Sequence, residues 1–235
     1  INSDTTGAAA LQIKVSENAD AITDLTNDKQ NVISDLETIR SGAAAGATAL
    51  QELAEKGFLT SSCCPAFVQY IKSAFPDLVP LISHNPSPMA ALAAYIKKTD
   101  ETAKVVFIGP CTAKKAEAQL ENVKPFVDAV MTFEELQALY DSKDIDITTL
   151  DENVLDNASY YGRIFARSGG LSDAVVQALK EQEIEFDLKP VVCDGIEECR
   201  IALLKKSKNV LDANFIEGMA CVGGCIGGAG CLTHG

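Results

Sequence analysis

Residues 190–217 read PVVCDGIEECRIALLKKSKNVLDANFIE, and this stretch predicts a strand, a helix and a second strand. The apolar run at 190–193 is bounded by turn residues and has the length of a buried strand, as does 214–217. Residues 195–206 lie between them and are long enough for a helix. A strand, a helix and a returning strand form a crossover, which places the two strands parallel in one sheet.

The same alternation recurs upstream. Pro65 suits the first turn of a helix, where its missing N–H costs nothing, and Gly57 suits a helix C-cap. Thr132 and Glu135 are spaced as a capping box. The predicted strands are 58–60, 104–108 (buried), 126–131 and 163–166, and the predicted helices are 50–56, 65–75, 86–98, 132–142 and 171–181. Strands alternating with helices predict an α/β domain with a largely parallel sheet.

The first 46 residues differ from the rest. Six apolar residues follow a heptad pattern there, which indicates a helical segment: Val15, Ile22, Leu25, Val32, Leu36 and Ile39. Residues 41–47 are a low-complexity run of Ser, Gly and Ala. We therefore divide the chain into a helical leader at 1–46, appended or fused, and a partial domain at 47–235 that carries the chemistry. Because the chain opens with Ile1, we expect a fragment of a longer protein.

Composition excludes several classes of function. The net charge is −13, which argues against nucleic acid or an anionic membrane as partner, since both require clustered Lys and Arg. No apolar run approaches the roughly 20 residues that cross a bilayer, and no secretion signal is recognisable. We expect a cytoplasmic protein with no membrane insertion.

The placement of eight cysteines predicts a metal site. Without a secretion signal, this number favours metal or redox chemistry over disulfides. Adjacent cysteines such as Cys63 and Cys64 bridge each other only with severe strain. Cys63 and Cys64, Cys111, and Cys221 each follow a predicted strand, and ligands gather at the carboxyl ends of strands in parallel sheets. These cysteines are therefore expected to share one site.

Residues 217–231 read EGMACVGGCIGGAGC, a stretch suited to enclosing a bulky inorganic cluster. Small residues let the backbone approach closely and leave N–H groups free to bond sulfides. Cys64, Cys111, Cys221 and Cys225 supply the four thiolates that a 4Fe–4S cluster needs. Zinc also takes four thiolates and stays an alternative, although paired Cys-x-x-Cys motifs are absent. Cys193 and Cys199 fit buried core thiols, and the sequence leaves the role of Cys231 open.

Three segments carry a family resemblance. TSSCCPAFV at 60–68, PCTAKKAE at 110–117 and the glycine-rich run at 217–230 resemble, in order, the signature segments of the FeFe (iron-only) hydrogenase H-cluster catalytic domain. FARSGG at 165–170 extends the similarity, which covers residues 47–235. The resemblance implies the two-lobed, mostly parallel α/β fold of the iron-only hydrogenase large subunit.

The resemblance also implies roles for single residues. Cys64, Cys111, Cys221 and Cys225 would ligate the 4Fe–4S part of the H-cluster. Cys225 would also bridge to a di-iron subcluster that carries CO, cyanide and a dithiolate. Four further residues would serve that subcluster: Cys63 relays protons, Lys114 donates to a cyanide, Met219 packs against the irons and Ser83 lies on the proton path.

The implied activity is the reversible reduction of protons to H2. Its partners would be a ferredoxin or a ferredoxin-like domain, which exchanges electrons, and the hydrogenase maturation proteins. Departures such as Gly109, Val222 and Cys231 resemble non-prototypical hydrogenase groups. The usual acids of the proton path would fall near residues 40–50, which contain no acid. The alternative is a sensory or iron–sulfur assembly homologue that binds a 4Fe–4S cluster without H2 turnover. Cys63 and Lys114 favour the enzyme, because an assembly protein needs neither.

Overall fold

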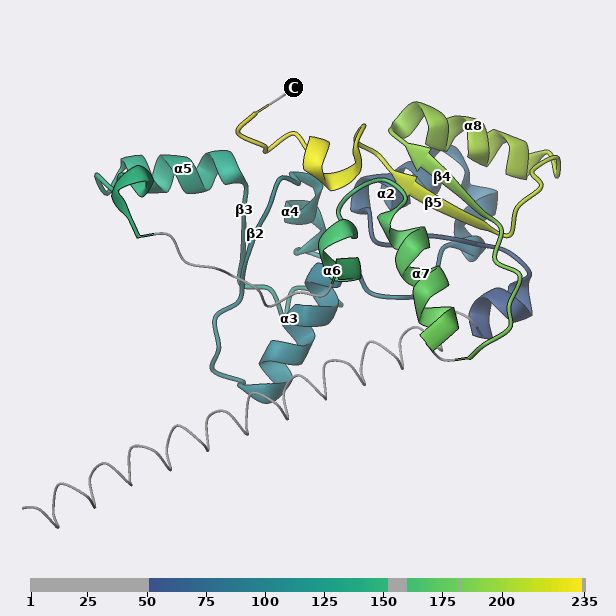
Figure 1. Ribbon diagram of the computed structural model, residues 1–235, viewed down its shortest axis with the longest axis horizontal. Coiled ribbons are helices and arrows are strands. Elements are labelled where there is room, and N and C mark those ends of the chain that lie inside the picture. Colours follow the sequence, from purple (N-terminus) through teal and green to yellow (C-terminus); the bar gives the residue numbers. More distant parts are fainter. Residues whose placement is uncertain (1–50, 152–159, 182, 234–235) are drawn as a thin grey trace, which may run out of the picture. The chain divides into compact units, whose positions relative to one another are not determined.

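The computed structural model describes residues 51–151, 160–181 and 183–233. The predicted leader at 1–46 lies outside these residues. Within the described part, the chain forms two parallel sheets with helices packed against them (Figure 1). This arrangement confirms the α/β class that the alternation of strands and helices predicts.

The first sheet contains three parallel strands in the order β1 (Leu59–Thr60), β5 (Phe215–Met219) and β4 (Pro190–Asp194). In its register Leu59 lies opposite Phe215, and Val192 lies opposite Glu217. The helix α8 (Ile196–Ser207) connects β4 to β5. The strand–helix–strand unit predicted from residues 190–217 is therefore confirmed, and its second strand takes the centre of the sheet.

Helices cover both faces of this sheet. On one face, α2 (Pro65–Ala74) and α8 bury Phe67, Ile71 and Leu203 against Ile216, and all four are fully enclosed. On the other face, α7 (Gly170–Glu181) brings Leu171 to the cluster that Leu53, Leu59 and Phe215 form. Figure 1 shows α8 and α7 on opposite sides of β4 and β5. A central strand buried on both faces fixes the end of β5, where Cys221 follows.

The second sheet pairs β2 (Val106–Ile108) with β3 (Ala129–Met131) in parallel. Met89 and Ala93 of α3 (Pro88–Thr99) pack with Phe107 and Val130 on one face. The strand predicted at 104–108 is confirmed at 106–108, but its predicted burial is wrong: Val106 is 46% exposed and Ile108 is 43% exposed. The reason is that the side chains of a strand alternate between its two faces, and Phe107, between these two residues, is the one that packs with the α3 cluster. The remaining elements are η1 (Pro76–Leu81), α4 (Ala113–Glu117), α5 (Phe133–Asp141), η2 (Ile147–Thr149), α6 (Tyr160–Ile164) and η3 (Gly224–Gly227).

Most helix boundaries follow the predicted local signals. Gly57 has a φ of +69° and donates its N–H to the Leu53 carbonyl at 2.8 Å, which ends the helical residues 51–56. Both hydrogen bonds of the Thr132–Glu135 capping box are present. The helix predicted from residue 86 begins at Pro88, because the Ser87 side chain caps it by accepting from the Ala90 N–H.

The predicted strand at 163–166 is wrong. Residues 160–164 form α6, and the chain then turns back through Arg167 N–H to the Ile164 carbonyl and Gly170 N–H to the Arg167 carbonyl. Gly169 has a φ of +85°, which permits this turn into α7. The apolar residues that indicate a strand here instead connect two helices that pack on each other.

A close approach at Gly218 gives the first testable prediction. A Cβ at this position of β5 would lie 2.4 Å from Cε1 and Cζ of the enclosed Phe67 ring. We expect Gly218→Ala to lower the free energy of unfolding by about 1–3 kcal/mol, through overpacking. Urea unfolding of the metal-free chain measures this cost. In a Phe67→Leu background the cost should shrink, and an equal cost in both backgrounds would contradict the assignment of the strain to Phe67.

Candidate metal centre

The predicted cysteines follow the ends of strands from both sheets. Cys63 and Cys64 come after β1, and Cys64, which is 8% exposed, is the N-cap of α2. Cys111 comes after β2, directly before the turn into α4. Cys221 follows β5, and Cys225 lies in η3. Three chain segments therefore carry thiols from the carboxyl ends of three strands, two in the first sheet and one in the second.

The thiols lie within electrostatic range of one another. Burial, together with smaller contributions from the neighbouring thiols of Cys64 and Cys111, raises the pKa of Cys225 to about 11. Burial also raises the pKa of Cys221, again with contributions from Cys64 and Cys111. The structure thus brings the four sulfurs together. Iron would offset the repulsion between their thiolates, so metal binding here should release protons.

Backbone hydrogen bonds tie the glycine-rich loop around Cys225 to the loop before Cys111 and to the segment between α6 and α7. The Gly230 N–H donates to the Pro110 carbonyl at 2.8 Å, next to Cys111, and the Cys225 N–H donates to the Ala166 carbonyl at 2.7 Å. A Cβ on Gly228 would lie 2.5 Å from the Pro110 oxygen. A glycine is needed at that point, because any side chain would separate the η3 loop from the Cys111 loop.

The grouping of the thiols bears on the choice between zinc and an iron–sulfur cluster. Among the described residues, no three His, Cys, Asp or Glu side chains are grouped as ligands of one metal ion. A mononuclear tetrahedral site needs such a group. A cubane binds each thiolate through a different iron, so its ligands stand further apart. The donor set, four thiols within electrostatic range of one another, has the chemistry that a 4Fe–4S cluster requires.

A buried ion pair lies beside these cysteines. Lys114 and Glu117 of α4 are 6% and 8% exposed, and Lys114 Nζ lies 2.6 Å from Glu117 Oε2. Lys114 Nζ also donates to the Cys63 carbonyl at 3.3 Å. The sequence leaves open whether Glu117 pairs with Lys114 or lies on a helix surface, and the structure shows the pair. The site thus holds a fixed ammonium next to the loop that carries Cys63 and Cys64.

The other predicted site residues border the same region. Burial raises the pKa of the Cys63 thiol to about 12, with smaller contributions from Cys64 and Cys225, so at neutral pH it carries its proton. Met219 ends β5 and is 2% exposed. Ser83 lies between η1 and α3, where its N–H donates to the Thr60 carbonyl at 3.0 Å and its hydroxyl accepts from the Asn85 N–H.

Comparison with known proteins places the chain. Residues 29–229 match the family described as the iron only hydrogenase large subunit, C-terminal domain. The chain belongs to this family. A solved [FeFe]-hydrogenase structure, HydA(ΔEFG), superimposes with a TM-score of 0.62 at 21% identity, covering 85% of this chain and 68% of that one. The fold of the iron-only hydrogenase domain, expected from the three signature segments, is therefore confirmed.

Curated relatives of two kinds match this iron-only hydrogenase family chain. Iron hydrogenase 1 of Clostridium pasteurianum is 27% identical over 72% of this chain and 37% of its own length. The cytosolic Fe-S cluster assembly factor NAR1 of Kluyveromyces lactis is 28% identical over 66% of this chain and 36% of its own length. The chain thus spans little more than a third of either relative.

None of its described helices is both long and apolar enough to span a membrane.

Two acids that the sequence does not single out, one buried and one partly buried, hold the loops near the cysteines in place. Glu217 of β5 is fully enclosed and accepts from the Gly169 N–H at 2.9 Å and the Ser172 N–H at 2.8 Å, at the start of α7. Asp194 accepts from the Ser168 hydroxyl and the Gly223 N–H, both at 2.6 Å. An acid within a strand that is buried on both faces is the signal that could have identified Glu217.

The remaining cysteines divide between core and site. Cys193 of β4 and Cys199 of α8 are 1% and 0% exposed within the core of the first sheet, which agrees with their interpretation as core thiols. Cys231 is partly buried and donates to the Ile226 carbonyl at 3.1 Å. Its charge contributes to the raised pKa of Cys221, so this thiol lies near Cys221.

Proposed function

We propose that this chain is the H-cluster-binding module of an FeFe hydrogenase that reversibly reduces protons to H2. Cys64, Cys111, Cys221 and Cys225 would hold the 4Fe–4S cluster, and Cys225 would also bridge to a di-iron subcluster with CO, cyanide and dithiolate ligands. When bound, this group stores electrons and makes or cleaves the bond of H2. The observation that carries the proposal is a buried Lys114 ammonium beside a ring of four thiols.

The surrounding residues have distinct tasks in this proposal. Lys114 offers N–H donors and a positive charge to an anionic ligand such as cyanide, in a place where little water screens it. The Cys63 thiol keeps its proton at neutral pH and can give it to a base on the subcluster. Met219 supplies an apolar, polarisable wall that keeps water from the irons. Ser83 would lie on the proton side of the site.

Electrons would come from a ferredoxin or a ferredoxin-like domain. This sequence contains no separate Cys-x2-Cys-x2-Cys run for further clusters. Hydrogenase maturation proteins would deliver the di-iron subcluster. The chain spans only 37% of the length of the Clostridium pasteurianum enzyme.

A second candidate is an iron–sulfur assembly homologue, which the match to NAR1 favours. Such a protein would hold an ordinary cubane on the same four thiols. An assembly protein with an ordinary cubane has no anionic ligand that would need a buried ammonium, such as Lys114, whose Nζ lies 3.3 Å from the Cys63 carbonyl. Lys114 therefore favours the hydrogenase over this alternative.

Infrared spectroscopy after maturation with a synthetic di-iron complex tests the proposal. We expect CO and cyanide bands, together with a rise from about four to about six irons per chain. Lys114→Met should lose these bands. Lys115→Met, the same change at an exposed neighbour that pairs with Glu135, should keep them. About four irons and no bands in the unmodified chain would favour the assembly function, and bands without H2 turnover would favour a sensory one.

A further inference from the structure

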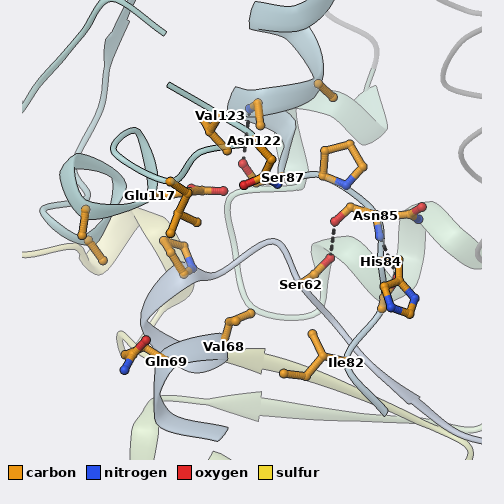
Figure 2. Close-up of a pocket in the computed structure, with 18 of the residues that line it drawn as sticks. Ser62, Val68, Gln69, Ile82, His84, Asn85, Ser87, Glu117, Asn122 and Val123 are labelled. Carbon is orange, nitrogen blue, oxygen red and sulfur yellow. Dashed lines mark hydrogen bonds between the residues drawn. The ribbon is translucent and has the colours of Figure 1, made fainter. Parts of the chain in front are cut away.

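A cavity of about 1020 Å³ opens between α2, α3 and α4, next to the candidate metal centre (Figure 2). A water molecule takes up about 30 Å³, so the cavity has room for many waters. Hydrophobic side chains form much of its wall, and a set of polar residues crosses it: Ser62, Ser83, His84, Asn85, Ser87, Glu117 and Asn122. The metal centre does not use most of these residues.

Glu117 forms the inner end of this polar set. Its Oε2 binds Lys114, whereas its Oε1 has no hydrogen-bond partner among the described residues. Figure 2 shows its carboxylate pointing into the cavity, toward Ser87 and Asn122. A carboxylate oxygen that faces a cavity can exchange protons with the water inside it. Through Lys114, the same side chain is linked to the loop of Cys63.

His84 forms the outer end of the set. Its side chain is 80% exposed, and its Nδ1 forms a short contact with Glu52 Oε1. The His84 backbone N–H donates to the other oxygen of Glu52 at 3.1 Å. Imidazole is the side chain that ordinarily takes up and releases protons near neutral pH. The carboxylate therefore holds a proton-exchanging ring in one orientation at the mouth of the cavity.

The charged groups around this pair keep Glu52 ionised. Burial opposes ionisation of Glu52, but hydrogen bonds from Lys56 and His84 outweigh it and hold its pKa below the ordinary value. Lys56 Nζ lies 2.7 Å from Glu52 and also donates to the Pro80 carbonyl. Lys72 of α2 is the lysine that lines the cavity among the described residues.

The segment between these ends is hydrogen-bonded to the Cys63 loop. The Ser62 hydroxyl donates to the Asn85 carbonyl at 2.7 Å, and the Asn85 N–H donates to the Ser83 hydroxyl. Figure 2 shows the bond between Ser62 and Asn85 across this side of the cavity. Polar groups therefore extend from His84 at the surface to the neighbour of Cys63.

We propose that the His84–Glu52 pair is the proton uptake and release group of this chain, and that the cavity carries protons between it and Glu117. The inference rests on the proposed hydrogenase function. In the direction of H2 formation, His84 takes a proton from solvent and passes one to cavity water. Glu117 accepts that proton at the inner end and gives it up to the metal centre, where it enters the H2 that forms. Each group returns to its initial protonation state after every turnover, so the route needs no other reactant.

Turnover of the matured chain tests the route. We expect His84→Gln to lower H2 formation on the order of tenfold to a hundredfold and to change its pH profile, because a general acid is lost. Added imidazole should restore much of the rate, since the position is exposed. The infrared bands should not change. Glu55→Gln, on the same helical segment but without a bond to His84, is the matched control and should behave as the unmodified chain.

A second measurement needs no cluster. In the metal-free chain, His84→Gln should raise the pKa of Glu52 toward its ordinary value, as followed by carbon NMR, whereas Glu55→Gln should leave it unchanged. Normal turnover, an unchanged pH profile or a lack of imidazole rescue in His84→Gln would overturn the route while the hydrogenase function stands. An unmoved Glu52 pKa would also overturn it. Absence of turnover in the unmodified matured chain would overturn both.

Discussion

Cys111→Ala is expected to abolish cluster binding. After reconstitution with iron and sulfide, the unmodified chain should hold about four irons, and the variant should hold well under one. The reason is that Cys111 is the thiol contributed by the second sheet, and the other three thiols cannot occupy its corner of a cubane. Iron analysis and the visible absorbance of the reconstituted protein measure the loss.

Cys199→Ala is the matched control for this experiment. It removes a thiol that is fully buried and donates to the Met219 carbonyl at 3.5 Å, near the same end of β5. The control should keep about four irons, because Cys199 lies on the buried face of α8 and outside the proposed ligand set. Retention of iron by Cys111→Ala, or its loss from Cys199→Ala, would refute the assignment of ligands.

The elements that short-range signals define could be predicted from the sequence. Pro65, Gly57 and the Thr132–Glu135 pair each act within one turn of a helix, and each lies where its local chemistry predicts. The strand–helix–strand unit at 190–217 follows from an apolar pattern and its length. These signals depend on near neighbours in the chain, so one sequence contains them in full.

Features that depend on distant partners could not be predicted in this way. Glu217 accepts a hydrogen bond from the Ser172 N–H, 45 residues away in the chain. Nearly every residue has a backbone N–H, so the sequence does not indicate which one a buried acid will bind. The turn through Gly169 joins α6 to α7 although residues 163–166 have the apolar character of a strand. Likewise, residues 104–108 have the apolar composition of a buried strand. Whether Val106 is buried depends on which elements pack against the second sheet, and it is exposed.

The candidate site lies between these two cases. The signature segments indicate the four cysteines, and in the structure their thiols lie near one another. The Lys114–Glu117 pair spans only three residues, and the sequence alone cannot tell whether it is buried or exposed. Burial decides its consequences, because an ion pair in solvent contributes little whereas a buried one is costly to break.

Lys114→Met is accordingly expected to lower the free energy of unfolding of the metal-free chain by about 3–5 kcal/mol at neutral pH. The substitution keeps the length of the side chain but leaves the Glu117 carboxylate buried at 8% exposure without a countercharge. Lys115→Met, the same change on the exposed side of α4, should cost less than about 1 kcal/mol. Urea unfolding at neutral pH measures both.

The double variant Lys114→Met/Glu117→Gln decides between lost charge pairing and lost packing. Glutamine has the shape of glutamate without its charge, so the second substitution should recover much of the stability that the first one loses. Recovery would show that the uncompensated carboxylate causes the loss. Additive costs would show instead that Lys114 acts through its packed side chain and its bond to the Cys63 carbonyl. In the first case Lys114 acts through its positive charge. An anionic ligand of the bound cluster would then share that charge with Glu117.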